Sequence, residues 1–587
     1  MIDYETTESC GGECLTRWWN LPLGTFLLLV PFISYLCTSA LWFLGFTLSR
    51  WVLLPGIIGA FAIVFFYRKS LSLSGRKLSY VLVSFLLLLI SGTCISEYIY
   101  DYAYDGMLYH QPIIYSLMNG WNPVYETESP YFKGEYFASF VNYYPKGMET
   151  MAAVFASFFQ NIEAGKIVNW LFLSSSFCLS SYFVNNLFRE KLASWKKVVL
   201  TILLCYSPVT IVQLCTFYVD WSLYFILLAI IVFLYDLAHA KEKSRIRMDE
   251  ILIGVLMAMA ASIKITVMFW ATAFLVVLFV FGKVQGYFKQ WRSLVATGIL
   301  GGLLGFFVLA FNPYMCNVLG GKYLFYPFLG EQAVNVDAVQ EQALEGYDRI
   351  ESVLMSLVSR PSSNQAYKGP FDLSIDSAIQ SGKAEVKLGG FGLFFFEILL
   401  LGIVLYLSCY KKDRKWYLAG VGLSLLFLAL LVLPNGWWAR FTPFFYFFPL
   451  FCLFYGVKFG GNFVRKGCKV MVLLMVVNIG VTQASAMGLM FIHRSKVHYL
   501  MEVLEKSPQP IKMYCHNWTL HHQLEQHNIQ TIACDTLSAV LTYPGSPVKI
   551  DPIEWKVDKV NKDEYFFLKY SNIKDSIYTA DKDSSMK

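Results

Sequence analysis

Charged side chains are scarce in this chain. Asp, Glu, Lys and Arg together make up 15% of its 587 residues, while apolar residues make up 56%. A soluble globular protein is about one-quarter charged and about half apolar, so this composition excludes an ordinary soluble domain. The formal charge of +7 does not indicate a nucleic-acid partner, because the basic residues form short clusters between apolar runs.

A cysteine framework is also missing. The thirteen cysteines are scattered, many of them inside apolar runs, where cysteine packs as a small hydrophobe. Cys10 and Cys14 form a C-x3-C pair, but no second pair follows that would complete a zinc site. A cleavable signal peptide does not fit either, because residues 1–20 are acidic and the first apolar run is too long. We therefore expect that run to remain as a helix.

Long apolar runs are abundant instead. The hydrocarbon core of a bilayer is about 30 Å thick and takes about 20 apolar helical residues to cross. We predict about thirteen such spans, and therefore an all-α polytopic membrane protein. The predicted spans cover residues 22–46, 51–66, 79–97, 165–186, 198–218, 221–238, 250–264, 266–282, 293–312, 389–410, 416–433, 441–458 and 469–489.

The basic clusters support this count. Six connections between spans hold three or four Lys or Arg residues each, and with thirteen spans all six fall on one side of the membrane. Cytoplasmic loops carry an excess of Lys and Arg, so we expect the N-terminus in the cytoplasm and the C-terminus outside. The clusters lie within residues 68–77, 189–197, 241–247, 283–292, 411–415 and 458–469.

This topology predicts three parts. Residues 1–78 form an N-terminal cytoplasmic segment and two leading transmembrane helices. Residues 79–489 form the transmembrane core, with long outer loops at 98–150 and 313–388. Residues 490–587 form a small extracytoplasmic α/β domain. Its β-like runs at 511–515, 531–534 and 565–568 alternate with a helical stretch near 520–527.

Acidic and aromatic side chains gather in the first outer loop. Residues 98–150 hold six acids and only two lysines, interleaved with Tyr, Trp and His. Topology does not explain these acids, since Asp and Glu contribute little to membrane orientation. A carboxylate beside a sugar hydroxyl can act as a general base, and a cation can neutralise the phosphate of a lipid-linked donor. The loop therefore fits a glycosyl-transfer site, where aromatic faces pack against sugar rings.

The motifs of this loop resemble those of a known family. The string D-x3-Y-H-x-P at residues 105–112 is similar to the first-loop signature of a large bacterial group of GT-C membrane glycosyltransferases. A G-W-N-P-V-Y segment at 120–125 and a Y-P-K-G-M-E element at 144–149 follow in the order of that pattern.

Further elements of the family's pattern continue along the chain to about residue 490. One segment departs from it, because Lys322-Tyr323-Leu324 stands where the family usually has Gly-Asn-Pro. The matching elements are Y-V-D at 218–220, S-I-K-I-T at 262–266, N-V-L through F-Y-P at 317–327, G-G-F-G at 389–392 and W-W-A-R-F-T-P at 437–443.

The resemblance implies an inverting, single-displacement glycosyltransferase of the bacterial inner membrane. Its donor would be a polyprenyl-phosphate-linked sugar and its acceptor a lipid or a glycan, both at the extracytoplasmic face. Asp105 matches the family's first-loop carboxylate and is our candidate general base. Asp101 is a second candidate, which could orient the acceptor. No metal site is assigned, although Asp101 and Asp105 together could hold Mg²⁺ or Mn²⁺.

Six further residues are candidate substrate contacts. Arg440 is our first choice to bind the donor phosphate, because the planar guanidinium suits phosphate and the residue lies in a predicted outer loop. Lys264, a cation within an otherwise uncharged stretch, is the second choice. Ordinary structural roles stay open, such as a helix cap for Asp220 or an outward-pointing anchor for Lys264. The six residues are Tyr109, His110, Glu149, Asp220, Lys264 and Arg440.

Other functions stay open at this point. A transporter or flippase for a lipid-linked glycan commonly shows repeated halves and broken spans, and no repeat is evident in this sequence. A glycan polymerase or ligase that uses lipid-diphosphate donors would share the long outer loops, but would rely more on Arg and His than on a first-loop Asp. A noncatalytic scaffold of the same fold is the third alternative.

Overall fold

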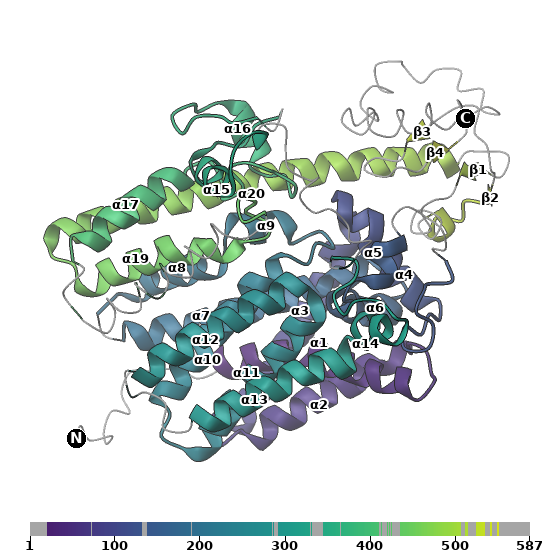
Figure 1. Cartoon of the computed structure of the whole chain (residues 1–587), viewed down its shortest axis with the longest axis horizontal. Helices are drawn as coiled ribbons and strands as arrows, with labels where there is room; N and C mark the ends of the chain where they lie inside the picture. The colour runs from purple at the N-terminus through teal and green to yellow at the C-terminus, as the bar shows by residue number, and fades with distance from the viewer. Residues whose placement is uncertain are drawn as a thin grey trace.

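The structure, a computed structural model, consists mainly of helices that lie side by side (Figure 1). Between residues 20 and 505 it describes the chain apart from 72, 132–137, 190, 285, 287–290, 329, 331–343, 364–365 and most of 410–434. Beyond residue 505 it describes 511–514, 524–533, 541–542 and 549–550.

The long helices form the bundle, and shorter helices form most of its loop regions. The bundle helices are α1 (Asn20–Phe43), α2 (Leu53–Phe66), α3 (Gly75–Tyr98), α7 (Ile167–Leu187), α8 (Ser194–Cys205), α10 (Trp221–His239), α11 (Lys243–Ile263), α12 (Ile265–Val284), α13 (Trp291–Leu304), α17 (Phe395–Leu407), α19 (Phe447–Phe459) and α20 (Asn462–Glu505). The shorter helices are η2 (Gly106–His110), α4 (Gln111–Met118), α5 (Ala138–Tyr143), α6 (Gly147–Phe159), η3 (Ile162–Lys166), α9 (Pro208–Gln213), α14 (Phe311–Leu319), α15 (Arg349–Val358), α16 (Ile375–Gln380) and η7 (Pro443–Tyr446).

Seven stretches of the described chain are long and apolar enough to cross a membrane, in agreement with a multi-pass helical membrane protein. They are Asn20–Phe43, Gly75–Tyr98, Ile162–Leu187, Trp221–His239, Ile265–Val284, Arg292–Leu309 and Asn462–Ser495. Four shorter apolar helices occupy Arg50–Phe66, Gly147–Phe159, Phe395–Leu407 and Pro443–Phe459. The predicted span at 416–433 lies largely outside the described residues, and the count of thirteen stays a prediction.

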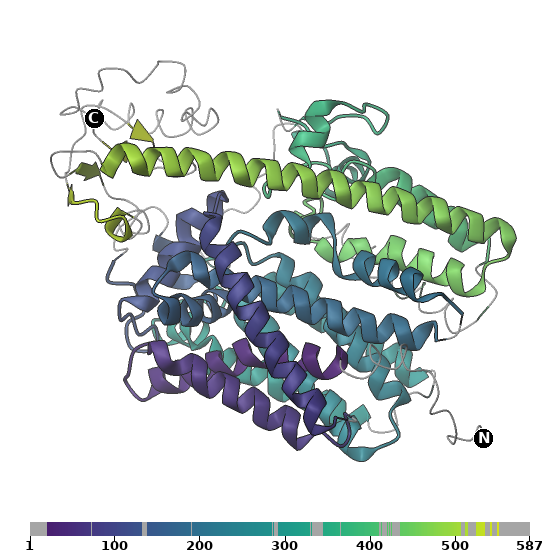
Figure 2. The ribbon, with the colours of Figure 1, turned by 180° about the vertical axis from the view of Figure 1, so that it is seen from behind.

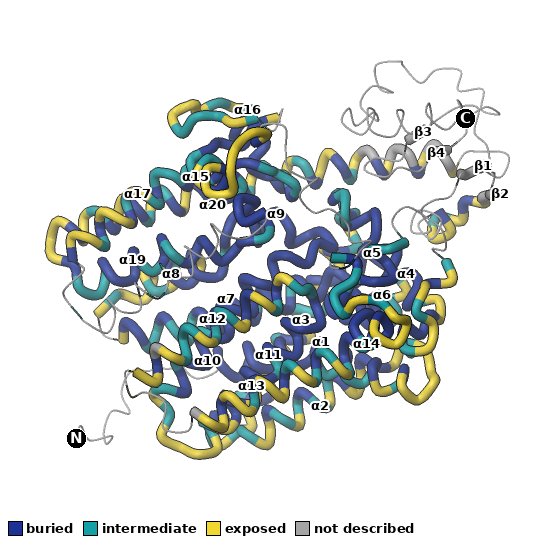
Figure 3. Tube along the Cα trace, in the orientation of Figure 1, coloured by how far each residue is buried: buried dark blue, intermediate teal, exposed yellow. Residues whose placement is uncertain are grey.

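The interior of the bundle is apolar and centres on α10. In the apolar stretch of α10, 83% of the residues are buried, against 28% in the stretch that contains α13. Figure 3 shows the exposed positions of α2, α13 and α17 along the outside of the bundle. Among these exposed side chains are Phe66, Leu300 and Leu407, so the outer surface of the bundle is apolar as well, as a lipid-facing surface requires.

Close helix packing depends on glycine where α11 and α13 meet. A Cβ atom added at Gly301 would lie 2.0 Å from the carbonyl oxygen of Gly254. One added at Gly305, the first residue of the π-helical turn η4 (Gly305–Leu309) that continues α13, would lie 2.7 Å from that of Ala258. The two helices therefore run parallel in close contact. On the other side of the bundle (Figure 2), α3 packs against α1 through Phe85 and Phe26, whose ring centroids are 5.3 Å apart.

The basic connections gather at one end of the bundle, which we call the basic end. Ser70 and Ser244 are hydrogen-bonded, so the connections after α2 and α10 touch. Glu250 of α11 accepts a hydrogen bond from Ser293 of α13, which brings the connection before α13 to the same place. Lys458 interacts electrostatically with Lys191 and Asp413. This interaction brings together the remaining three connections, at 189–197, 411–415 and 458–469. This clustering agrees with the predicted distribution of charge.

A small sheet follows α20. Its four short strands are β1 (Ile511–Tyr514), β2 (Thr531–Ala533), β3 (Leu541–Thr542) and β4 (Lys549–Ile550), in the order β2-β1-β4-β3. β1 pairs in parallel with β2 and antiparallel with β4. The first two strands confirm the predicted β-like runs, whereas the run at 565–568 lies outside the described residues.

Candidate functional site

A partly buried ion pair joins the first outer loop to the segment before α19. Asp105 directly precedes the π-helical turn η2, and Arg440 lies in the short turn before η7. The Nη2 atom of Arg440 donates to Asp105 Oδ2 at 2.8 Å. The two residues are 335 positions apart in the sequence, and the fold brings together the predicted base and the predicted phosphate ligand.

Asp220 and Lys264 complete a group of four charges, which we call the charged cluster: Asp105, Asp220, Lys264 and Arg440. Lys264 Nζ lies 2.5 Å from Asp220 Oδ1, and Arg440 Nε lies 3.1 Å from Asp220 Oδ2. Lys264 is the extended residue between α11 and α12, and Asp220 directly precedes α10. Burial alone would raise the pKa of Asp220, but the two cations outweigh burial and lower it. Asp220 is therefore ionised and balances both cations.

Aromatic rings surround the Arg440 guanidinium. Its central carbon lies 4.5 Å from the ring centroid of Tyr218 and 4.4 Å from that of Trp438. Cation–π contacts of this kind stabilise a desolvated guanidinium. A Cβ atom added at Gly390 would lie 2.8 Å from the Cβ of Ala439. The G-G-F-G and W-W-A-R elements are therefore in direct contact beside the cluster.

Tyr109 faces the same cluster. Its hydroxyl donates to Asp105 Oδ2 at 3.2 Å, and its ring lies 5.8 Å from the ring of Tyr144. Burial and the nearby carboxylate of Asp105 raise the pKa of Tyr109 well above its ordinary value. The phenol is therefore protonated at neutral pH and serves as a hydrogen-bond donor.

His110 and Glu149 form a separate pair beside the cluster. His110 Nδ1 lies 2.5 Å from Glu149 Oε1, and both side chains are buried. The imidazole ring is 4.3 Å from the ring of Tyr109 and 6.3 Å from that of Tyr218. The pair therefore supports Tyr109 and Tyr218, both of which form hydrogen bonds with Asp105.

Asp101 lies apart from the charged cluster. Its Oδ1 atom accepts the backbone N–H of Ala103 at 2.9 Å, and its Oδ2 atom accepts that of Phe217 at 3.0 Å. Burial first, and the charge of Glu163 second, raise the pKa of Asp101 to about 7. These contacts favour a structural role for Asp101, which fastens the first outer loop to the segment before α10.

Glu385 is a part of the site that the sequence motifs did not indicate. Its Oε1 atom accepts the hydroxyl of Tyr218 at 2.6 Å and the backbone N–H of Tyr104 at 2.5 Å. Burial and the charge of Asp105 raise the pKa of Glu385. The one sequence signal for Glu385 is its place four residues before the G-G-F-G element.

The carboxylates of the charged cluster differ in accessibility. The Asp105 side chain is 18% exposed, while that of Asp220 is 4% exposed. Asp105 is therefore the more solvent-accessible carboxylate of the cluster. Among the described residues no group of three or more His, Cys, Asp and Glu side chains could hold a metal ion. Each Asp101 oxygen accepts one backbone amide, and a joint metal site of Asp101 and Asp105 stays a prediction.

Comparison with known proteins does not assign this arrangement to a family. No protein-family model, no curated protein and no solved structure matches the chain significantly.

Proposed function

We propose that the protein is a membrane glycosyltransferase of the GT-C type. It transfers a sugar from a polyprenyl-phosphate-linked donor to a lipid or glycan acceptor, at the extracytoplasmic face of a bacterial inner membrane. The observation that carries this proposal is the 2.8 Å pair between Asp105 and Arg440. It joins a candidate base and a candidate phosphate ligand within one partly open cluster.

The charges of the cluster suit an inverting displacement. The acceptor hydroxyl gives its proton to Asp105 as its oxygen forms a bond to the anomeric carbon. The bond between that carbon and the phosphate oxygen breaks, and its electron pair leaves with the polyprenyl phosphate. Negative charge therefore moves from Asp105 to the phosphate. Arg440, which pairs with Asp105 beforehand, is then free to bind the leaving group, and such stabilisation of developing charge accelerates transfer.

The remaining charges keep this exchange in place. Asp220 holds Lys264 and Arg440 from the buried side, so both cations stay fixed while Asp105 changes charge. Tyr109 donates to the same Asp105 oxygen as Arg440 and orients the carboxylate. A site held ready in this way does not have to reorganise when the reaction occurs.

The test is a transfer assay on purified protein in lipid vesicles, with a panel of polyprenyl-phosphate sugars and a crude membrane acceptor. Asp105→Asn keeps the shape of the side chain and removes the base, so transfer should fall by about 10²–10⁴. Glu126→Gln is the matched control, because Glu126 is an exposed acid of the same loop and its variant should transfer at the wild-type rate.

The outcomes separate the alternatives. Full transfer by Asp105→Asn would remove Asp105 from the mechanism. Wild-type protein that binds the donor lipid and moves it between leaflets without transfer would be a flippase. Activity restricted to lipid-diphosphate donors would identify a polymerase or ligase.

A further inference from the structure

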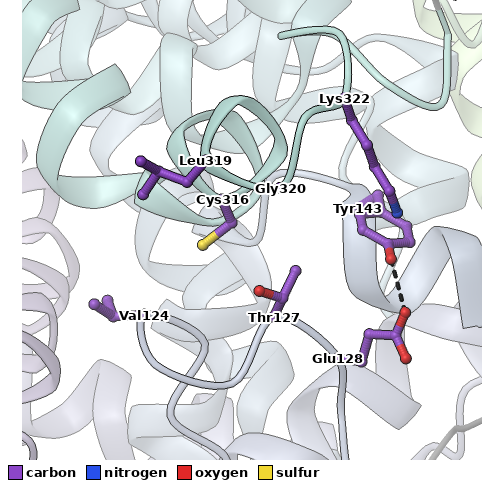
Figure 4. Close-up of a pocket in the computed structure, with 8 residues that line it drawn as sticks. All are labelled: Val124, Thr127, Glu128, Tyr143, Cys316, Leu319, Gly320 and Lys322. Carbon is purple, nitrogen blue, oxygen red and sulfur yellow. Dashed lines mark hydrogen bonds between the residues drawn. The ribbon is translucent and has the colours of Figure 1, made fainter.

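A second polar site lies beside the charged cluster, in a pocket of about 450 Å³. This volume is within the range of about 300–1,000 Å³ that is typical of small-molecule sites. The pocket lies between the first outer loop, the end of α5 and the end of α14 (Figure 4). The lining residues that matter for recognition are Val124, Glu128, Tyr143, Leu319 and Lys322.

One wall of the pocket carries a cation and an anion on either side of a tyrosine. Glu128 Oε1 accepts the hydroxyl of Tyr143 at 2.8 Å. Lys322 Nζ lies 3.6 Å from the ring centroid of Tyr143 and 4.7 Å from that of Tyr326. Figure 4 shows Lys322, Tyr143 and Glu128 in this order along one wall. Val124 and Leu319 lie at the other side of the pocket.

The ammonium group of Lys322 has N–H donors available for a ligand. Within the part of the chain that the structure describes, Lys322 forms no side-chain hydrogen bond and no ion pair within 4.0 Å. Burial lowers its pKa, and the charge of Glu128 only partly offsets this effect. An anionic ligand group would restore a full charge–charge partner, which is the stronger class of hydrogen bond.

The pocket adjoins the charged cluster through consecutive residues. Tyr143 lines the pocket, whereas Tyr144 contacts Tyr109 and lies in the field of Asp105. Tyr109, in turn, donates to Asp105 Oδ2 at 3.2 Å. A chain of sugar residues that extended from the pocket along this row of tyrosines would lead toward the proposed base.

We propose that this pocket binds an acidic sugar residue of the acceptor, next to the residue that receives the transferred sugar. Lys322 binds the acidic group, Glu128 accepts a sugar hydroxyl, and Val124 and Leu319 contact the apolar face of the ring. The cation comes from the segment that directly follows α14. The acceptor role rests on the proposed function, but binding itself does not.

Ligand-detected saturation-transfer NMR on the purified protein tests binding without any need for activity. Methyl β-glucuronide and methyl β-glucoside differ only in a carboxylate against a hydroxymethyl group. The glucuronide should bind at least about tenfold more tightly, as expected for one added charged hydrogen bond. Glucose 6-phosphate is the third probe, and its preferential binding would support the proposal with phosphate as the acidic group.

Variants locate the site. Lys322→Met should abolish the preference for the acidic sugar, and Lys322→Arg, which keeps the charge, should retain it. Lys196→Met is the matched control, because Lys196 also lies over an aromatic ring, 5.5 Å from that of Trp195, but at the basic end. Binding of the glucoside as tight as that of both acidic probes, no binding of any probe, or an unchanged preference in Lys322→Met would overturn the proposal.

A failure of the proposed function is distinguishable from a failure of this inference. Asp105→Asn should bind the glucuronide as the wild type does. If both proteins bind it and neither transfers a sugar, the pocket stands and the glycosyltransferase assignment falls. If the wild type transfers sugar with equal preference for neutral and acidic acceptors and binds no acidic probe, the assignment stands and the pocket proposal falls.

Discussion

Asp220 is the residue on which the balance of charge in the site depends. It is 4% exposed and pairs with both Lys264 and Arg440. Removal of one partner from a buried ion pair costs about 3–5 kcal/mol, because the other charge is left without compensation. We therefore expect Asp220→Asn to lower the free energy of unfolding by about this amount.

Thermal unfolding in detergent measures this effect, with Asp105→Asn as the comparison. Asp105 is more exposed, and its loss leaves Arg440 paired with Asp220, so this variant should unfold close to the wild type. Equal unfolding temperatures for wild type and Asp220→Asn would contradict a structural role of the pair.

The raised pKa of Asp101 predicts that the stability of the protein depends on pH. Its pKa is raised from an ordinary 3.8 to about 7, so between these values the folded protein holds a proton that the unfolded chain releases. The contribution of Asp101 to stability is therefore fully present below about pH 4 and declines until the pH passes about 7. Asp101→Asn stays neutral and should lack this decline, which amounts to roughly 1–4 kcal/mol.

Unfolding temperatures at pH 5 and pH 8 check this sign. The wild type should lose stability relative to Asp101→Asn as the pH rises. The neighbours Glu163 and Lys166, which form an ion pair beside Asp101, are the same in both proteins. A difference between the two proteins that does not change with pH would show that Asp101 is ionised throughout.

At the level of single residues, the sequence indicated side chains that the fold brings into contact, while their roles stay predictions. Asp105, Tyr109 and Arg440 come together as expected. The D-x3-Y-H-x-P pattern favoured Asp105 over Asp101, but it could not show that Asp101 binds backbone amides, because one of these belongs to the distant Phe217. Glu385 could not be ranked above other loop acids, because its importance comes from the Tyr218 hydroxyl that it meets only in the fold.

Among the elements, apolar run length predicted the central helices well and the broken ones poorly. The predicted span 198–218 is interrupted, because Ser207 caps α9 by accepting the N–H of Thr210 and Pro208 occupies the first turn. The Ser-Pro pair carries this signal in the sequence, but the surrounding run is apolar on both sides of it. α20, conversely, has 44 residues and continues well beyond the predicted span 469–489, since hydropathy marks membrane crossing and not the end of a helix.

The motifs that the sequence analysis singled out act as contacts between elements. Gly147 of the Y-P-K-G element lies so close to the S-I-K-I-T element that an added Cβ atom would be 2.7 Å from the carbonyl oxygen of Ser262. The Nζ atom of Lys146 donates to the backbone oxygens of Asn142 and Tyr144 and to Asn312 Oδ1. These contacts hold the first outer loop against α11 and α14 and so keep Asp105 in place.

Across the whole molecule, charge is distributed unequally between two ends. The basic connections meet at one end, and the charged cluster and the pocket are built from the opposite connections. The composition and the positions of the basic residues were sufficient to predict this separation. They could not predict the pairing of segments hundreds of residues apart, which depends on how the helices pack.

The positive-inside rule gives this separation a direction that can be measured. A protease recognition site inserted at Gly346, an exposed turn of the second outer loop, should be cleaved by protease added outside spheroplasts. The same insertion at Lys241, an exposed residue of the basic end, should be cleaved only after lysis. Exposed turns of this kind tolerate insertions. Cleavage of the Lys241 insertion alone from outside would place Asp105 and Arg440 in the cytoplasm, and an extracytoplasmic lipid-linked donor could then not reach them.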